Sequence, residues 1–399
     1  MKSSFSIFHG DHVLWGIIAL LAVFSFLPVY SSSTNLAYVV GKGTPMGYLI
    51  KHFFIILFGF GLMLAIHRVP FQYFKGISIL MLPVSIVLLL YTATQGTVID
   101  GANASRWIRI PLIGLSFQTS TLASLTLLTY LANYLSKGKI QSATFKSTVL
   151  YLWLPVLVVV LLIFPSNFST AALLFFMASV LIFISGYPLK YLFVILASGI
   201  GMAMLFILMA KAFPNAVPNR IDTWINRIQN FNQADDATGN YQIERAKIAI
   251  ATGGIFGVGA GKSVMKNFLP QSSSDFIYAI IVEEWGALGG GLLILLYLIM
   301  LFRIVVIAHK SSSPFGKLLV MGIGIPIVLQ AFVNIGVALQ VFPVTGQTLP
   351  LISSGGTSAW MTCIALGMIL SVSRAMGSTQ SQTIEVDENN PLSVLSETV

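Results

Sequence analysis

The stretch GGIFGVGAGKSVMKNFLPQSSSDFIYAIIVEEWG, residues Gly253 to Gly286, joins a polar loop to an apolar segment of the kind that crosses a membrane. Asp275 lies where the polar run ends and the apolar run begins, and Glu283 and Glu284 follow inside the apolar run. Charge is scarce in this chain, since Asp, Glu, Lys and Arg make up 9% of its 399 residues. Three carboxylates at such a boundary therefore indicate a functional site.

The composition identifies a membrane protein. Hydrophobic residues make up 56% of the chain and the mean hydropathy is +0.86, which is more apolar surface than a water-soluble core can bury. The net charge of +9 is spread over the loops, so it does not indicate nucleic-acid binding. The single cysteine, Cys363, excludes a disulfide framework, and the scattered histidines lack the spacing of a zinc hydrolase.

The sequence predicts an all-α, polytopic integral membrane protein with about ten transmembrane helices. A span requires about 20 largely apolar residues. The candidate spans are residues 13–30, 49–66, 77–94, 112–135, 147–164, 170–186, 189–210, 276–307, 318–339 and 356–373. Residues 1–373 then form one membrane domain, and the polar, acidic residues 374–399 are expected to be a disordered cytoplasmic tail.

Lysine and arginine predict the orientation of these spans. Outside the long loop, eleven of these residues fall on one side of the membrane and four on the other, which predicts that both termini are cytoplasmic. The loop between spans seven and eight, residues 211–275, is then extracytoplasmic. Residues 221–228 and 241–252 have the period of helices that lie along the membrane surface. The eighth span is long, and glycines 286 and 289–291 are candidates for a break or kink.

Several motifs in the loops have both a functional and a structural interpretation. The segment 257–263, GVGAGKS, resembles a phosphate-binding loop, but Phe256 stands where that motif needs its first glycine, which favours a flexible turn. Lys262 remains a candidate for anion contact. Arg106 precedes a tryptophan, so it either anchors the membrane interface or belongs to a site. Pro and Gly in the segment 343–356 predict a tight turn, which does not account for the hydroxyls of Ser353 and Ser354, so both serines are candidates for binding substrate.

The three carboxylates also have alternatives. Aspartate before a helical run is a good N-cap, so the local sequence leaves Asp275 open between cap and catalytic base. Glu283 and Glu284 lie about 12 Å further along a helix and cost several kcal/mol there unless they are paired or face a wet cavity. They are as compatible with ion transport as with catalysis.

Taken together, these motifs resemble those of the SEDS proteins, the FtsW and RodA family. The resemblance rests on the ten spans, the long loop after the seventh, and matching residues in the segments 253–257, 269–286 and 334–356. It implies a peptidoglycan glycosyltransferase that polymerises lipid II outside the bacterial cytoplasmic membrane, with Asp275 as the essential aspartate. The implied partners are a class B penicillin-binding transpeptidase and other divisome proteins, because the opening spans and the acidic tail favour the division branch.

Two segments depart from the family pattern. Residues 118–121 read QTST where the family usually has QPSE with a lysine soon after, and residues 166–171 read SNFSTA where it usually has PDLGTA. Roles of the missing charges therefore do not transfer to this chain.

The expected reaction is an inverting glycosyl transfer. The acceptor 4-hydroxyl would lose its proton to Asp275, while a divalent cation or basic residues would offset the charge of the diphosphate leaving group. Arg106 is the first candidate for that second role, followed by Arg245 and Lys262, and the carboxylates of Glu283 and Glu284 could hold a cation or orient a base. No cofactor is assigned with certainty. The alternatives are a flippase for a lipid-linked precursor and a non-catalytic activator of a transpeptidase.

Overall fold

The computed structural model describes residues 8–38, 43–94, 98–99, 102–103, 107–109, 116–138, 140, 142–212, 240–269 and 272–388. Within these ranges the chain is mainly α-helical, with two short antiparallel hairpins. The helices are α1 (His12–Tyr38), α2 (Pro45–Arg68), α3 (Tyr73–Thr94), α4 (Thr119–Leu135), α5 (Phe145–Thr148), the π-helix η1 (Val149–Trp153), α6 (Leu154–Ile163), α7 (Phe168–Ile184), α8 (Leu189–Ala212), α10 (Asn240–Gly253), the 3₁₀-helix η2 (Met265–Asn267), α11 (Ile277–Lys310), α12 (Pro314–Ala338) and α13 (Thr357–Glu388). The strands are β1 (Val98–Ile99), β2 (Ala102–Asn103), β3 (Trp107–Arg109) and β4 (Ser116–Gln118).

The prediction of a polytopic helical membrane protein is confirmed. Seven helices in the described part of the chain are long and apolar enough to cross a membrane, and α7 and the first part of α8 are shorter apolar helices. With α4, each of the ten predicted spans coincides with a helix. Ten crossings remain a prediction, because length and composition alone do not show which helices cross.

Local sequence determines where several of these helices begin. Thr44 and Ser313 cap α2 and α12 with their side-chain oxygens, and in both helices proline occupies the first turn, where its missing N–H is not needed. Asn167 caps α7 in the same way, by accepting from the N–H of Thr170 at 3.3 Å.

The structure differs from the sequence predictions in two places. The fourth helix begins at Thr119 and not near residue 112, because Ser116–Gln118 pairs as β4 with β3 and this backbone pairing replaces the first helical turns. The last helix, α13, is helical as far as Glu388, past the boundary predicted at residue 373. Residues 389–399 and the predicted surface helix at 221–228 lie outside the described residues.

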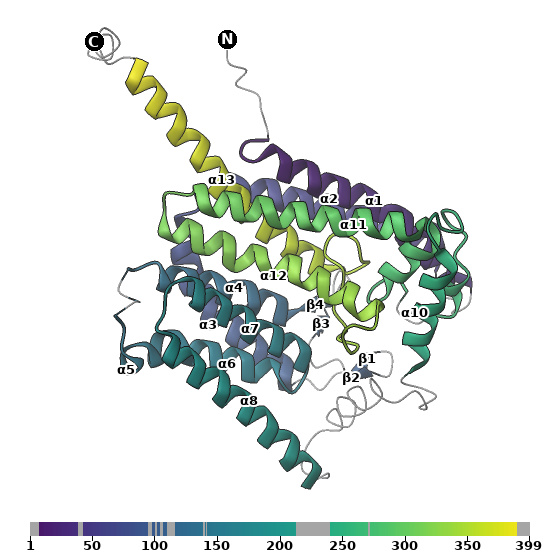
Figure 1. The fold of residues 1–399 in the computed structure, drawn as a ribbon, viewed down its shortest axis with the longest axis horizontal. Helices are drawn as coiled ribbons and strands as arrows, with labels where there is room; N and C mark the ends of the chain where they lie inside the picture. Colours follow the sequence, from purple (N-terminus) through teal and green to yellow (C-terminus); the bar gives the residue numbers. More distant parts are fainter. Residues whose placement is uncertain are drawn as a thin grey trace.

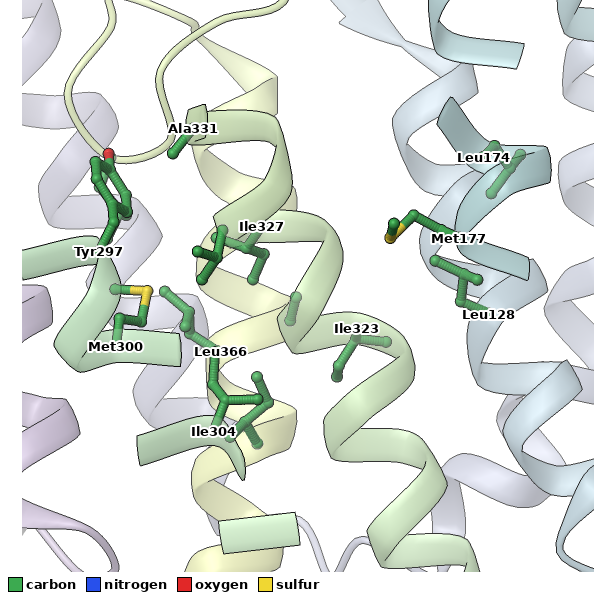
Figure 2. Packing of buried hydrophobic residues seen from close by; sticks show 14 of the residues in the cluster. Leu128, Leu174, Met177, Tyr297, Met300, Ile304, Ile323, Ile327, Ala331 and Leu366 are labelled. Atoms are coloured by element: carbon green, nitrogen blue, oxygen red, sulfur yellow. The ribbon is translucent and has the colours of Figure 1, made fainter. Parts of the chain in front are cut away.

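The core is organised around α12. Its buried side chains Ile323, Ile327 and Ala331 lie between α11 and α13 on one side and α4 and α7 on the other (Figure 2). Tyr297, Met300 and Ile304 come from α11, Leu366 from α13, Leu128 from α4, and Leu174 and Met177 from α7. Because α12 is in the middle, polar residues at its end can reach loops from several helices.

The two ends of the bundle differ. The beginning of α1 and the far end of α13 lie at one end, whereas β1 to β4 and α10 lie at the opposite end (Figure 1). Helix α10 runs across the direction of the bundle helices there. Helix α10 and the beginning of α11 therefore lie at the end that is remote from both ends of the described chain.

Candidate active site

Helix α11 is interrupted at Gly286, whose backbone angles (φ 69°, ψ −173°) are not helical. Such a break frees carbonyl groups before it and N–H groups after it, and these must find other partners. Two consecutive loop N–H groups, those of Val258 and Gly259, donate to the freed carbonyls of Glu283 and Glu284 at 2.9 and 3.0 Å. The two residues after Gly286 donate back to loop carbonyls at 2.8 and 3.2 Å. The loop thus completes the broken helix, and the predicted break is confirmed at Gly286.

Three glycines permit this contact because the two backbones touch directly. A Cβ added at Gly253, Gly257 or Gly286 would lie within 2.0, 2.3 or 2.1 Å, respectively, of a carbonyl oxygen on the opposite segment. The glycine-rich sequence therefore has a structural explanation, since its backbone faces another backbone and not a phosphate. The side chain of Lys262, further along the same loop, is exposed.

The carboxylates of Glu283 and Glu284 are buried, with exposed fractions of 0% and 2%. Glu283 accepts hydrogen bonds from the N–H groups of Val264 and Met265 at 2.9 and 3.2 Å and from the hydroxyl of Ser263. Glu284 accepts from the N–H of Ser263 at 3.4 Å. These partners stabilise the two buried charges and hold the loop on α11. Both side chains thus anchor the loop on α11, and their expected part in holding a cation or orienting a base stays a prediction.

Two residues that the sequence analysis missed complete this network. The hydroxyl of Ser31, in α1, donates to Glu284, and Lys266 in η2 donates to the Ser31 oxygen at 3.1 Å and to the carbonyl of Gly261 at 2.7 Å. Ser31 belongs to a run of serines at the end of an apolar helix, which was the available signal. Its partner lies more than 200 positions away, so local sequence could not predict the pairing.

Asp275 lies just before α11, and its side chain is half-buried. The N-cap position belongs to the next residue, Phe276, so the structure does not put Asp275 at the position that the capping alternative requires. A Cβ added at Gly346 would lie 3.6 Å from the carboxylate oxygen Oδ2 of Asp275. The carboxylate therefore faces the segment 343–356, the second stretch selected from the sequence.

That segment is fastened to the residues just before Asp275. The hydroxyl of Ser353 donates to the carbonyl of Ser274 at 2.6 Å and accepts from the N–H of Leu349 at 2.8 Å. The N–H of Ser354 donates to the carbonyl of Ser273 at 2.9 Å. Ser353 is buried and its hydroxyl is engaged by backbone, which is a structural role, whereas the side chain of Ser354 is exposed next to the site.

Two side-chain amides on α12 hydrogen-bond to backbone carbonyls of the segment 343–356. Asn334 donates to the backbone carbonyls of Asp275 and Gln347 at 2.8 and 2.7 Å. One turn earlier, Gln330 donates to the carbonyl of Thr348 at 2.9 Å. Asn334 belongs to a segment that matches the family, but the sequence alone did not predict this contact. The available signal was an amide in the middle of an apolar helix, where an unpaired polar group is costly.

The three predicted cations belong to different segments of the chain. Arg245, on α10, lies over the rings of Tyr241 and Phe268, with its guanidinium carbon 4.9 and 5.9 Å from the ring centroids. Lys262 is exposed in the loop that precedes η2. Arg106 lies outside the described residues. Their roles in binding substrate stay predictions.

The two segments that depart from the family pattern are neutral and hydrogen-bonded. Gln118 donates from its side chain to Ser120 at 3.0 Å, and Thr119 lies 3.2 Å from the hydroxyl of Thr92 on α3. At the second segment Thr170 accepts from the side chain of Gln347 at 2.8 Å. At the positions where the family usually carries charge, the hydroxyl of Thr121 donates to the carbonyl of Gln118 at 2.8 Å, and the side chain of Asn167 accepts from the N–H of Thr170 at 3.3 Å.

A metal ion would require ligands contributed jointly by protein and substrate. In the described ranges, no group of three or more His, Cys, Asp or Glu side chains could hold a metal ion. Mg²⁺ commonly binds through one or two carboxylates together with substrate phosphates. Asp275 is the half-buried carboxylate at this site that could share such an ion, so a divalent cation stays a prediction.

Comparison with known proteins identifies the family. The FtsW/RodA/SpoVE family, described as "Cell cycle protein", matches residues 11–377. The chain belongs to this family. The match covers α1 to α12 and the apolar part of α13, Thr357–Gly377, including every element that builds the site.

Relatives and solved structures within the family agree with this assignment. A protein of Hydrogenovibrio crunogenus named "Probable peptidoglycan glycosyltransferase FtsW" is 33% identical over 372 residues, which cover 91% of each chain. A protein of the same name from Coxiella burnetii is 31% identical, over 83% of this chain and 87% of the relative. The Thermus thermophilus rod shape determining protein RodA has a TM-score of 0.65 at 25% identity, covering 92% of this chain and 97% of that one. A chain in a structure titled "Structural coordination of polymerization and crosslinking by a peptidoglycan synthase complex" has a TM-score of 0.70 at 25% identity, covering 92% and 98%.

Proposed function

We infer that this family member is a peptidoglycan glycosyltransferase of cell division. Family membership and the shared name of the relatives, each matched over most of its length, support this inference. The observation that carries the site assignment is the position of Asp275. Its carboxylate is half-buried, faces Gly346, and lies on a backbone held by Asn334 and by the loop around Ser353.

The reaction joins two lipid-linked sugars. The 4-hydroxyl of the acceptor attacks the anomeric carbon of the donor, and Asp275 takes the hydroxyl proton as the new C–O bond forms. The bond from the anomeric carbon to the lipid diphosphate breaks, and the diphosphate leaves with the electron pair, which inverts the anomeric centre. Arg106, Arg245, Lys262 and a divalent cation are the candidates for offsetting the charge of this leaving group.

We propose the cytoplasmic membrane as the location, with both termini in the cytoplasm and the site on the outer face. The excess of lysine and arginine on one side of the predicted spans supports this orientation. The ends of the described chain also lie at the end of the bundle opposite the site (Figure 1). Lipid II, which carries its own leaving group in the membrane, is the substrate that fits such a site.

Replacing Asp275 tests the catalytic assignment. An amide cannot take the acceptor proton, and loss of a general base typically lowers a rate about 10²- to 10⁴-fold. We expect Asp275→Asn protein to insert and melt as wild type does but to form almost no glycan from fluorescent lipid II in the presence of its partner. Glu244→Gln, an exposed carboxylate change on α10, is the matched control and should remain active. Polymerisation by Asp275→Asn protein would refute the role of base.

The partner proposed for this chain is a class B penicillin-binding transpeptidase, together with other divisome proteins. The structural similarity to a chain of a peptidoglycan synthase complex supports it. We expect polymerisation to be weak for the isolated protein and faster with the transpeptidase, whose binding would raise the competent fraction. Depletion in the cell should produce filaments. Equal rates with and without partner would contradict the first expectation, and round, swollen cells would contradict the division role.

A further inference from the structure

Asn334 connects the candidate base to the loop that faces it. The amide nitrogen Nδ2 lies 2.8 Å from the carbonyl oxygen of Asp275 and 2.7 Å from that of Gln347. An amide nitrogen carries two hydrogens, so one group can donate to both carbonyls at once. The residue is fully buried on α12, in the well-packed core of the bundle. A rigid helix therefore holds two loop backbones at a fixed separation.

This separation sets the surroundings of the carboxylate. Gly346 directly precedes Gln347, and a Cβ added to it would lie 3.6 Å from Oδ2 of Asp275. The same amide thus bonds to the backbone of Asp275 and to the loop that faces its carboxylate. We propose that Asn334 is a positioning residue that holds Asp275 in the orientation required for proton transfer, which rests on the function proposed above.

The other polar atom of the Asn334 amide has a different environment. Its oxygen Oδ1 is buried and finds no hydrogen-bond partner among the described residues. A buried acceptor without a partner lowers stability. An apolar side chain of the same volume would remove this unpaired oxygen, but it would leave the carbonyls of Asp275 and Gln347 without the donor that they share. The amide is therefore useful here for the two bonds that it donates.

A neighbouring residue provides a matched control. Gln330 lies one turn earlier on α12 and donates to the carbonyl of Thr348 in the same loop, whereas Asn334 donates to the carbonyls of Asp275 and Gln347. Asn334→Leu and Gln330→Leu each remove one amide that fastens the loop, and only the first releases the backbone of Asp275. Comparing the two separates positioning of the base from general support of the loop.

The expected difference is in turnover. Misplacing a reacting group by about 1 Å can lower a rate about 100-fold. In the complex with its transpeptidase, we expect Asn334→Leu to lower kcat for lipid II about 100-fold with little change in KM, and to change the shape of the dependence of kcat on pH. Gln330→Leu should keep kcat within about threefold and keep the wild-type pH profile. A merely structural role would reduce the folded fraction and leave the shape of that profile unchanged.

A second substitution keeps the test decisive if Asn334→Leu protein does not fold. Asn334→Thr retains one hydroxyl donor in the core, and we expect an intermediate kcat, about tenfold below wild type. If either folded variant matches Gln330→Leu in kcat and pH profile, the positioning role is wrong. Wild-type complex that forms no glycan would instead refute the proposed function, so the two failures are distinguishable.

Discussion

The carboxylate of Glu283 is the hydrogen-bond acceptor for three consecutive residues of a loop. Its two carboxylate oxygens accept from the N–H groups of Val264 and Met265 and from the hydroxyl of Ser263, and the side chain is completely buried. Such a carboxylate replaces the water that the loop donors would otherwise require. Its removal should therefore affect the fold of the loop before it affects any chemical step.

Substitutions at Glu283 should reduce stability in a defined order. Glu283→Ala leaves three donors unpaired, each costing about 1 to 3 kcal/mol when buried, whereas Glu283→Gln keeps one acceptor oxygen and should cost less. The midpoint of thermal unfolding in detergent, followed by intrinsic fluorescence, measures both. Glu244→Ala, at an exposed position on α10, should stay within about 0.5 kcal/mol of wild type. If Glu283→Ala melts like this control, the anchoring role is wrong.

At the scale of elements, the contact between the glycine loop and α11 gives a second prediction. Gly257 and Gly261 both have positive φ, 81° and 75°, so alanine is similarly strained at either position. Only at Gly257 would the added Cβ meet a backbone oxygen, that of Glu284 at 2.3 Å, while the space at Gly261 is open.

We therefore expect Gly261→Ala to lower the free energy of unfolding by about 1 to 2 kcal/mol, the cost of a left-handed residue. Gly257→Ala should cost clearly more, because the loop must also move away from α11 and break its hydrogen bonds there. Chemical unfolding and the yield of folded protein compare the two. Equal losses would mean that the close backbone contact is not needed.

The same elements indicate what sequence alone could predict. The ten helices were predicted from apolar runs, and a break in α11 was predicted from its cluster of glycines. Which glycine breaks the helix depends on the partner loop, since the hydrogen bonds at Gly286 come from residues 254–259, and no periodicity encodes that pairing. The prediction that α4 begins near residue 112 was wrong for a similar reason. Residues 116–118 form a strand that pairs with β3, and the apolar sequence there does not indicate that pairing.

The site was predicted in part. Local polarity and family resemblance predicted that Asp275 and the segment 343–356 belong to a site. The structure brings the two together. The contacts of Glu283 and Glu284 were not predictable, because their partners lie in a loop that has no regular spacing relative to α11. Ser31 and Lys266 were missed because a single hydroxyl or lysine carries no pattern. These contacts arise from tertiary packing and not from spacing.

At the scale of the whole molecule, an ion pair joins the residue before α1 to the last part of α11. The guanidinium of Arg303 on α11 contacts both carboxylate oxygens of Asp11, one of them through Nε at 3.2 Å, and exposed fractions are 26% and 7%. Asp11 also caps α1 by accepting from the N–H of Leu14 at 2.8 Å. The pair fixes α1 against α11 at the end of the bundle remote from the site.

A double-mutant cycle measures this pair without removing the cap. Asparagine caps a helix about as well as aspartate, so Asp11→Asn and Arg303→Gln remove mainly the charges. We expect a coupling free energy above about 1 kcal/mol, the upper end for fully exposed pairs, from unfolding of the two single variants and the double variant. Additive losses would show that the two charges do not stabilise each other.

During biosynthesis, the break at Gly286 allows the part of α11 after it to enter the bilayer before Glu283 and Glu284 are buried. The loop 253–265 leaves the ribosome before Glu283 and Glu284, so the donors for both carboxylates are made first. The part of α11 from Gly286 to Lys310 is long enough to cross a membrane, since about 20 residues suffice. The insertion machinery can therefore retain that part alone and release Ile277–Trp285 on the other side. The two glutamates then never have to partition into lipid, and their burial becomes a late docking step onto a loop that is already in place.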